Sequence, residues 1–192
     1  MNPICRARNF LLTTKKDETG KRKLVHLGFR IDEDILDNIK KAARKTETTV
    51  SNQTNKILRN WVTRDAYFQE LGFVPMSKDI LRAWINKIDE KELIFQAKEF
   101  GATAVEMIGY FFGEINVNTL IKFLDIFFSR FQSYQHNIDD KTHSYHINHD
   151  ICMNYSIFYG ELLRALIEPI IKAPVDIKSR SQKIIIISFD IL

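Results

Sequence analysis

Apolar and polar positions alternate most regularly in a short segment that begins at residue 25. One side of the alternation consists of Val25, Leu27, Phe29 and Ile31, and the other of His26, Gly28 and Arg30. A period of two predicts a β-strand with one buried face. Because no second strand is predicted before residue 64, the same strand of a second chain is the simplest partner for its backbone groups. The pattern therefore predicts an obligate dimer.

Two helices are predicted to follow this strand. Asp32 is a suitable N-cap with acidic residues after it, so a helix should begin at about residue 33. Its apolar positions recur at helical spacing: Ile35, Leu36, Ile39, Ala42 and Ala43. The threonine-rich stretch 46–49 predicts a turn, and Ser51 is the expected N-cap of a second helix that runs to Leu71, before Gly72. One face of that helix carries Thr54, Ile57, Leu58 and Trp61.

Three further helices are predicted between residues 77 and 128. Ser77 is the expected cap of the first helix, and Asp89 of the second, which should end at Gly113. Asn116 or Asn118 should open the third helix. The apolar faces of all three are broad, which is typical of buried helices.

The pattern changes again from about residue 142. Residues 142–152 alternate as a strand, residues 153–171 are helical, and residues 182–192 contain a β-branched run suited to a central strand. Two strands make a poor sheet, so either residues 131–138 add a third or a second copy of the chain completes it; the dimer favours the second copy. The expected fold class is α+β and helix-rich, with a basic flexible arm at 1–23, a first domain at 24–71 and an oligomerisation or sensor domain at 75–192.

Composition limits the class of protein. No stretch approaches the roughly 18 consecutive apolar residues of a membrane span, and the first twenty residues are too charged for a signal peptide. The two cysteines, Cys5 and Cys152, form no disulfide framework. We therefore expect a cytoplasmic protein without a membrane partner.

Positive charge is concentrated in the first third of the chain. Residues 1–64 contain 15 basic and 7 acidic side chains, a balance of +8, whereas the other 128 residues contain 13 basic and 17 acidic ones, a balance of −4. A basic arm ahead of the predicted strand can follow a nucleic-acid backbone or enter the minor groove. The charge asymmetry thus favours DNA as a partner over an ordinary helical hairpin with solvated charges.

A strand followed by two helices within about forty residues resembles the ribbon-helix-helix family of the Arc and Met repressors. The resemblance covers residues 24–64, about a fifth of the chain. It implies that strands from two chains enter the major groove and that His26, Gly28 and Arg30 face the bases. Of these, Arg30 can make a bidentate contact to guanine, worth about 1–3 kcal/mol of discrimination.

The resemblance also implies contacts to the DNA backbone. These fall on Ser51 and Asn52 at the start of the second helix, while the basic arm adds Lys21, Arg22 and Lys23. Two positions depart from the family pattern. Gly28 stands where a side chain usually reads a base, and the turn between the helices lacks the customary glycine.

A histidine-rich stretch raises the possibility of a metal. His136, His143, His146 and His149 lie close together in the sequence, followed by Asp150 and Cys152. Imidazole and thiolate suit zinc or nickel, and the two-domain layout is similar to that of nickel-responsive repressors. His149, Asp150 and Cys152 are the nearest candidate ligands. Alternate residues of a strand point to opposite faces, however, so exposed or structural histidines are the competing interpretation.

The expected function is a sequence-specific, DNA-binding repressor of transcription that acts as a homodimer or tetramer on double-stranded DNA. A metal-responsive regulator and an antitoxin-like interaction protein that autoregulates are the alternatives, and the aromatic-rich C-terminal part leaves a small apolar effector open. No glycine-rich phosphate loop, GxSxG or HExxH motif occurs, and Asp139 and Asp140 fit a solvated turn. We therefore do not expect an enzyme.

Overall fold

The computed structural model describes residues 25–70, 72–131 and 133–191, apart from the side chain of Tyr67. These residues form two compact units, one ending at Phe73 and the other beginning at Val74. The fold class is α+β and rich in helix. Among the described residues, no helix is both long enough and apolar enough to cross a membrane.

The first unit contains helices α1 (Glu33–Lys45) and α2 (Val50–Asn60), as the sequence predicts. Asp32 is the N-cap of α1, and acidic Glu33 and Asp34 occupy its first turn. The expected cap of α2 is wrong: the helix begins one residue earlier than Ser51, and Thr49 is the N-cap. The Thr49 hydroxyl accepts a hydrogen bond from the Asn52 N–H at 3.1 Å, which satisfies a free donor of the first turn.

The helical run of α2 continues beyond Asn60 but changes its type. A π-helical segment (Trp61–Asp65) connects α2 to the short helix α3 (Ala66–Glu70). Gly72 follows with φ +68°, a left-handed conformation that glycine adopts without strain. The long second helix of the prediction is therefore present as three successive helical segments.

Four helices of the second unit lie close to their predicted positions: α4 (Lys78–Ile85), α5 (Glu90–Phe112), α6 (Val117–Phe128) and α7 (Met153–Ile171). Ser77 caps α4, and the Asp89 carboxylate accepts from two N–H groups at the start of α5. Gly113 ends α5 with φ +74°. Of the two asparagines considered for α6, Asn116 is the cap, in a reciprocal capping box with Thr119.

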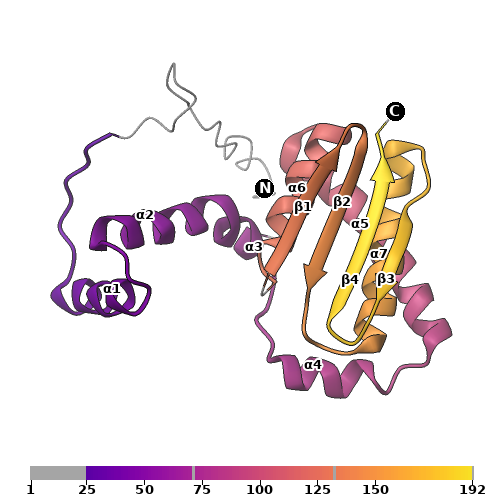
Figure 1. Cartoon of the computed structure of the whole chain (residues 1–192), viewed down its shortest axis with the longest axis horizontal. Helices are drawn as coiled ribbons and strands as arrows, with labels where there is room; N and C mark the ends of the chain where they lie inside the picture. The colour runs from indigo at the N-terminus through magenta and orange to yellow at the C-terminus, as the bar shows by residue number, and fades with distance from the viewer. Residues whose placement is uncertain (1–24, 71, 132, 192) are drawn as a thin grey trace, which may run out of the picture. The chain divides into compact units, whose positions relative to one another are not determined.

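The sheet of the second unit has four antiparallel strands: β1 (Ser133–Asp139), β2 (Thr142–Asn148), β3 (Asp176–Arg180) and β4 (Ile184–Asp190). Their order is β1-β2-β4-β3, and Figure 1 shows helices α6 and α7 behind the sheet. The expectation that a second copy completes the sheet is wrong, because β1 and β3 complete it within one chain. β4 is central, as predicted, but β2 ends at Asn148 and does not continue to residue 152.

The core lies between the sheet and the helices behind it. Inward residues of β2 and β4, such as Tyr145 and Ile187, are fully buried, as are Leu163 and Leu166 of α7. Phe128 of α6 is also fully buried and lies among several aromatic rings. The core is therefore continuous across α6, α7 and the two central strands.

Helices α5 and α7 approach closely at Gly101. A Cβ atom at this position would lie 2.6 Å from Ala165 Cβ and 2.8 Å from the Leu162 carbonyl oxygen. We expect Gly101→Ala to lower the free energy of unfolding by about 3 kcal/mol, because backbone must move to admit the methyl group. Chemical denaturation would measure this loss. Gly109→Ala in the same helix is the control, since its Cβ would meet only the flexible Ile115 side chain at 3.3 Å; equal losses in both variants would contradict the argument.

Candidate nucleic-acid interface

The alternating segment ahead of α1 is exposed, and in the single chain it does not form the predicted β-strand. Within the described part of the chain, residues 25–32 belong to no helix or strand. The apolar side chains are open to solvent: Val25 is 81% exposed, Leu27 71% and Phe29 56%. An exposed row of apolar side chains on an unpaired backbone is characteristic of a strand that needs a partner.

The helices after this segment also leave apolar side chains uncovered. In this unit the buried apolar residues, among those described, are Ile39 and Ala43 of α1. Large side chains on both helices are exposed: Ile35 on α1, and Val50, Ile57, Leu58 and Trp61 on α2 and the segment that follows it. Together with Val25, Leu27, Phe29 and Ile31, we call these residues the apolar surface of the first unit.

The turn between α1 and α2 is tight although it lacks glycine. Glu47 adopts φ +50°, the left-handed conformation that a glycine would take at lower cost. The Thr46 and Thr48 N–H groups donate to the carbonyl oxygens of Ala42 and Ala43 at the end of α1. These bonds close the helix end and fix where α2 begins.

The residues predicted to contact bases are accessible. His26, Gly28 and Arg30 are all exposed, and a Cβ atom added to Gly28 would meet nothing within 4 Å. Among the residues that the structure describes, none therefore requires glycine at position 28. The predicted backbone-contacting residues Lys21, Arg22 and Lys23 lie outside the described residues.

The start of α2 offers hydrogen-bond donors to an anion. Ser51 and Asn52 are exposed in its first turn. Thr49 accepts the Asn52 N–H, and the first backbone bond of the helix runs from Gln53 N to Thr49 O at 2.9 Å. The N–H groups of residues 50 and 51 precede that bond, so they have no partner within the helix. Combined with the helix dipole, these donors suit a phosphate group.

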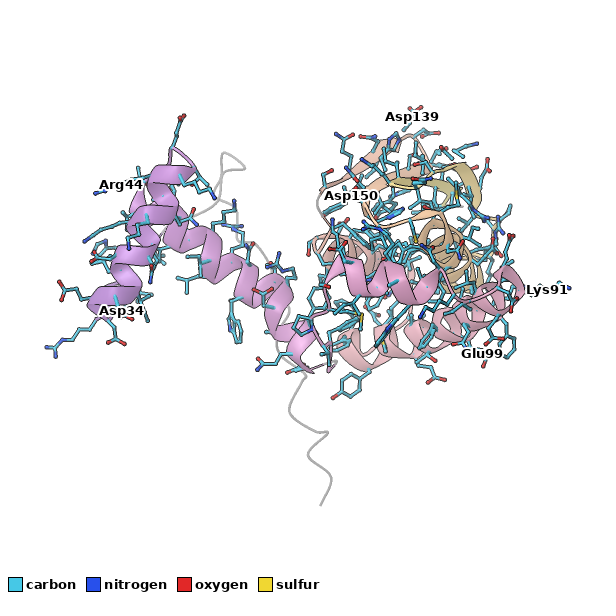
Figure 2. The ribbon with its side chains drawn as sticks, turned by 90° about the horizontal axis from the view of Figure 1, so that it is seen from below. Asp34, Arg44, Lys91, Glu99, Asp139 and Asp150 are labelled. Carbon is cyan, nitrogen blue, oxygen red and sulfur yellow. The ribbon has the colours of Figure 1, made fainter. Side chains whose placement is uncertain are left out.

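Charges at the two ends of α1 follow the same electrostatic rule. Asp34 lies in the first turn of α1 and Arg44 in the last, and Figure 2 labels both. Acidic side chains at a helix N-terminus and basic ones at its C-terminus each stabilise the helix by roughly 0.3–1 kcal/mol. The charges of α1 are thus explained by helix stability, and we assign them no DNA contact.

Within the described part of one chain, the residues predicted as metal ligands have other contacts. His149 is fully buried; its Nδ1 accepts from the Ile151 N–H at 3.1 Å, and its Nε2 lies 2.7 Å from the Ser156 hydroxyl oxygen. Because Nδ1 accepts, the neutral ring carries its proton on Nε2 and donates to Ser156, which donates to the Ser181 carbonyl. Burial lowers the pKa of His149 to about 4. Both ring nitrogens are therefore occupied by structural hydrogen bonds.

The other two candidates have separate environments. The carboxylate of Asp150 lies 3.7 Å from Lys78 Nζ and 3.8 Å from Lys183 Nζ, and Cys152 is a buried free thiol at the start of α7. Among the described residues, no group of three or more histidine, cysteine, aspartate or glutamate side chains could hold a metal ion.

Comparisons with protein-family models, with curated proteins and with solved structures found no match to this chain. The features of the first unit that can engage a partner are the exposed segment at residues 25–31, the apolar surface and the donors at the start of α2.

Proposed function

We propose that the chain is a sequence-specific DNA-binding repressor of transcription that acts as a homodimer through a two-stranded β-ribbon. The observation that carries the proposal is the exposed alternation of residues 25–31 next to two helices whose apolar residues are also uncovered. Pairing this segment with its copy would satisfy its backbone and bury both exposed sets together.

The energy of burial supports a dimer. A fully buried Leu, Ile or Phe side chain contributes roughly 1.5–3 kcal/mol relative to the exposed state. The first unit has two buried apolar residues among those described, which is little for a domain of its length. A second copy that covers the apolar surface would bury these side chains and provide the core that a single first unit lacks.

The same pairing would place the polar side of the ribbon toward DNA. If the apolar side chains face the helices, His26, Gly28 and Arg30 face outward as a row from each chain, and a two-stranded ribbon fits the major groove. Arg30 is the residue proposed to read a base. The donors at the start of α2 and the basic arm would hold phosphates on either side, in keeping with the balance of +8 over residues 1–64.

A salt titration of DNA binding by the full chain tests the proposal. We expect tighter binding to one palindromic duplex than to random duplexes, and a log–log salt slope that steepens by roughly 0.9 for each phosphate neutralised. Sedimentation of the same sample should give the mass of a dimer or a larger even assembly. Absence of DNA binding would refute the proposal and favour an antitoxin-like protein interface on the apolar surface.

Replacing Arg30 separates base reading from backbone binding. We expect Arg30→Ala to relax preference at one position of each half-site, at a cost of about 1–3 kcal/mol for the preferred base. Lys23→Ala is the comparison, because a phosphate contact weakens binding to all sequences alike. Binding to a panel of single-base variants would distinguish the two effects, and the same uniform loss in both variants would contradict the assigned roles.

A further inference from the structure

Three titratable side chains from different elements meet at one end of the sheet. His136 of β1 and His143 of β2 are joined by a hydrogen bond, with 2.8 Å between His136 Nε2 and His143 Nδ1. On the other side of the first ring, His136 Nδ1 lies 3.6 Å from Oδ1 of Asp125, which belongs to α6. The hairpin turn between β1 and β2 brings together histidines that stand seven residues apart in the sequence.

The surroundings of these three groups are aromatic. The ring of His136 stacks on Tyr145 at 4.0 Å between centroids, and that of His143 stacks on Phe189 of β4 at 5.7 Å. The other titratable groups that act on the cluster are the hydroxyls of Tyr134 and Tyr145, and burial raises the pKa of both, so they stay neutral. Asp125 Oδ1 and the Tyr145 hydroxyl are buried without a well-formed hydrogen bond to any described residue.

The shared hydrogen bond limits how many protons the two rings can hold. Two neutral imidazoles carry two N–H groups, one of which lies in the bond between the rings. One further proton fits on an outward-facing nitrogen. A second would put hydrogens on both nitrogens that face each other at 2.8 Å, and this contact would then break. The geometry therefore admits one additional proton on the pair.

Burial shifts the pKa of all three groups. Desolvation raises the pKa of Asp125 to about 6 and lowers the pKa of both histidines below their ordinary value. Below about pH 6, Asp125 loses its negative charge, and an imidazole that becomes charged there does so without that counter-ion. A lowered histidine pKa in the folded state means that stability is present at neutral pH and is lost on acidification, because the unfolded state binds the proton more readily. Asp125 has the opposite sign, because its raised pKa favours the folded state on acidification, so the loss of stability is assigned to the two histidines.

The outer strand is the element that depends on this cluster. Within the described sheet, β1 is an edge strand paired with β2. On its inward face Tyr134 and His136 are half-buried, and Ile138 is 61% exposed. The packing of β1 against α6 therefore depends largely on Tyr134 and on the contact between His136 and Asp125.

We propose that Asp125, His136 and His143 form one proton-responsive unit, and that its full protonation releases the edge strand β1 from α6 and from β2. Release of β1 would expose the backbone edge of β2, an unpaired edge that can accept another strand. The inference concerns the second unit alone and does not depend on the proposed function.

Backbone hydrogen exchange of the full chain, corrected for the intrinsic effect of pH, tests the proposal. Between about pH 8 and about pH 5, we expect the amides of β1 to lose at least severalfold more protection than those of β4, because the opening of β1 would be coupled to proton uptake by the two histidines. In the double variant His136→Gln, His143→Gln this difference should disappear. His146→Gln is the matched control, because His146 lies on β2 but is exposed on the opposite face; it should behave like the parent chain.

The substitution Asp125→Asn keeps the shape of the side chain but removes its charge. It allows a second measurement. Ring signals of His136 and His143 in the parent chain should move in two coupled steps, and the step near pH 6 should vanish in this variant. Equal loss of protection in β1 and β4 would overturn the proposal and indicate global destabilisation, for example through buried His149. Independent titration of the two rings at an ordinary histidine pKa would overturn it as well.

Discussion

Leu27→Asp is expected to abolish sequence-specific DNA binding and to convert the dimer to a monomer. Leu27 stands at the middle of the apolar row and is 71% exposed in the single chain, so the change should not unfold that chain. In the proposed ribbon the two copies of an aspartate would be buried close together without cations, and burial of unpaired like charges costs several kcal/mol. Specific affinity should fall at least about 1,000-fold, to the level of non-specific binding. Fluorescence anisotropy and sedimentation would measure both effects.

Val74→Asp is the matched control for this experiment. Val74 is also an exposed apolar residue outside the helices and strands, at 82%, but it lies outside the alternating segment. The Val74→Asp variant should bind DNA and dimerise like the parent chain. If Leu27→Asp retained both properties, the paired ribbon would be refuted and the exposed row would need another partner. Equal loss in both variants would instead indicate a general effect of added negative charge.

Phe128→Ala should be the most damaging single change to the second unit. The Phe128 side chain is fully buried at the end of α6, and its ring lies 5.0 Å from that of Tyr145 and 6.3 Å from that of Tyr159. Removing a buried phenyl ring loses its transfer energy and leaves a cavity, together about 3–5 kcal/mol. For a domain of this size the melting temperature should fall by roughly 10–20 °C, as calorimetry would measure.

Phe95→Ala removes the same ring from a position on α5 that is 59% exposed. Its effect on unfolding should stay within about 0.5 kcal/mol, as is usual for surface substitutions. A large loss at Phe95 would mean that this side chain is covered in solution. A small loss at Phe128 would mean that the core around α6 is less well packed than the structure indicates.

The helices were predictable because local signals determine them. Ser77, Asp89 and Gly113 act at helix ends through hydrogen bonds and backbone conformation that involve only near neighbours. The cap of α2 was misplaced by two residues, because Thr49 and Ser51 are both good caps and the choice depends on how the preceding turn closes. That closure uses a left-handed glutamate, for which the sequence offers no signal.

The sheet was only partly predictable, because strand pairing depends on distant residues. β3 has one apolar residue, Ile177, and is polar elsewhere, so no hydrophobic alternation marks it. It forms because β4 presents a long apolar strand that pairs on both sides. The prediction consequently assigned the missing partner to a second chain.

The candidate sites show the same limit. His149, Asp150 and Cys152 were predicted to share a site because they are close in the sequence. In the structure, both ring nitrogens of His149 form hydrogen bonds, one with Ser156 and one with Ile151. The pairing of His136 with His143 follows from the register of the β1–β2 hairpin, which the sequence did not reveal. The strand predicted at residues 25–31 is not formed in the single chain, because its pairing partner would have to come from a second copy, so it stays a prediction.

The strand order also has a consequence for the rate of folding. β1 with β2 and β3 with β4 are local hairpins, but the sheet is closed by β2 against β4, which pairs Thr142 with Asp190 across helix α7. Contacts between residues so distant in sequence form late, because the loop entropy must be lost before the contact stabilises the chain. The slow step of folding should therefore be the meeting of two preformed hairpins, and core mutations at the β2–β4 junction should slow folding more than those in either turn.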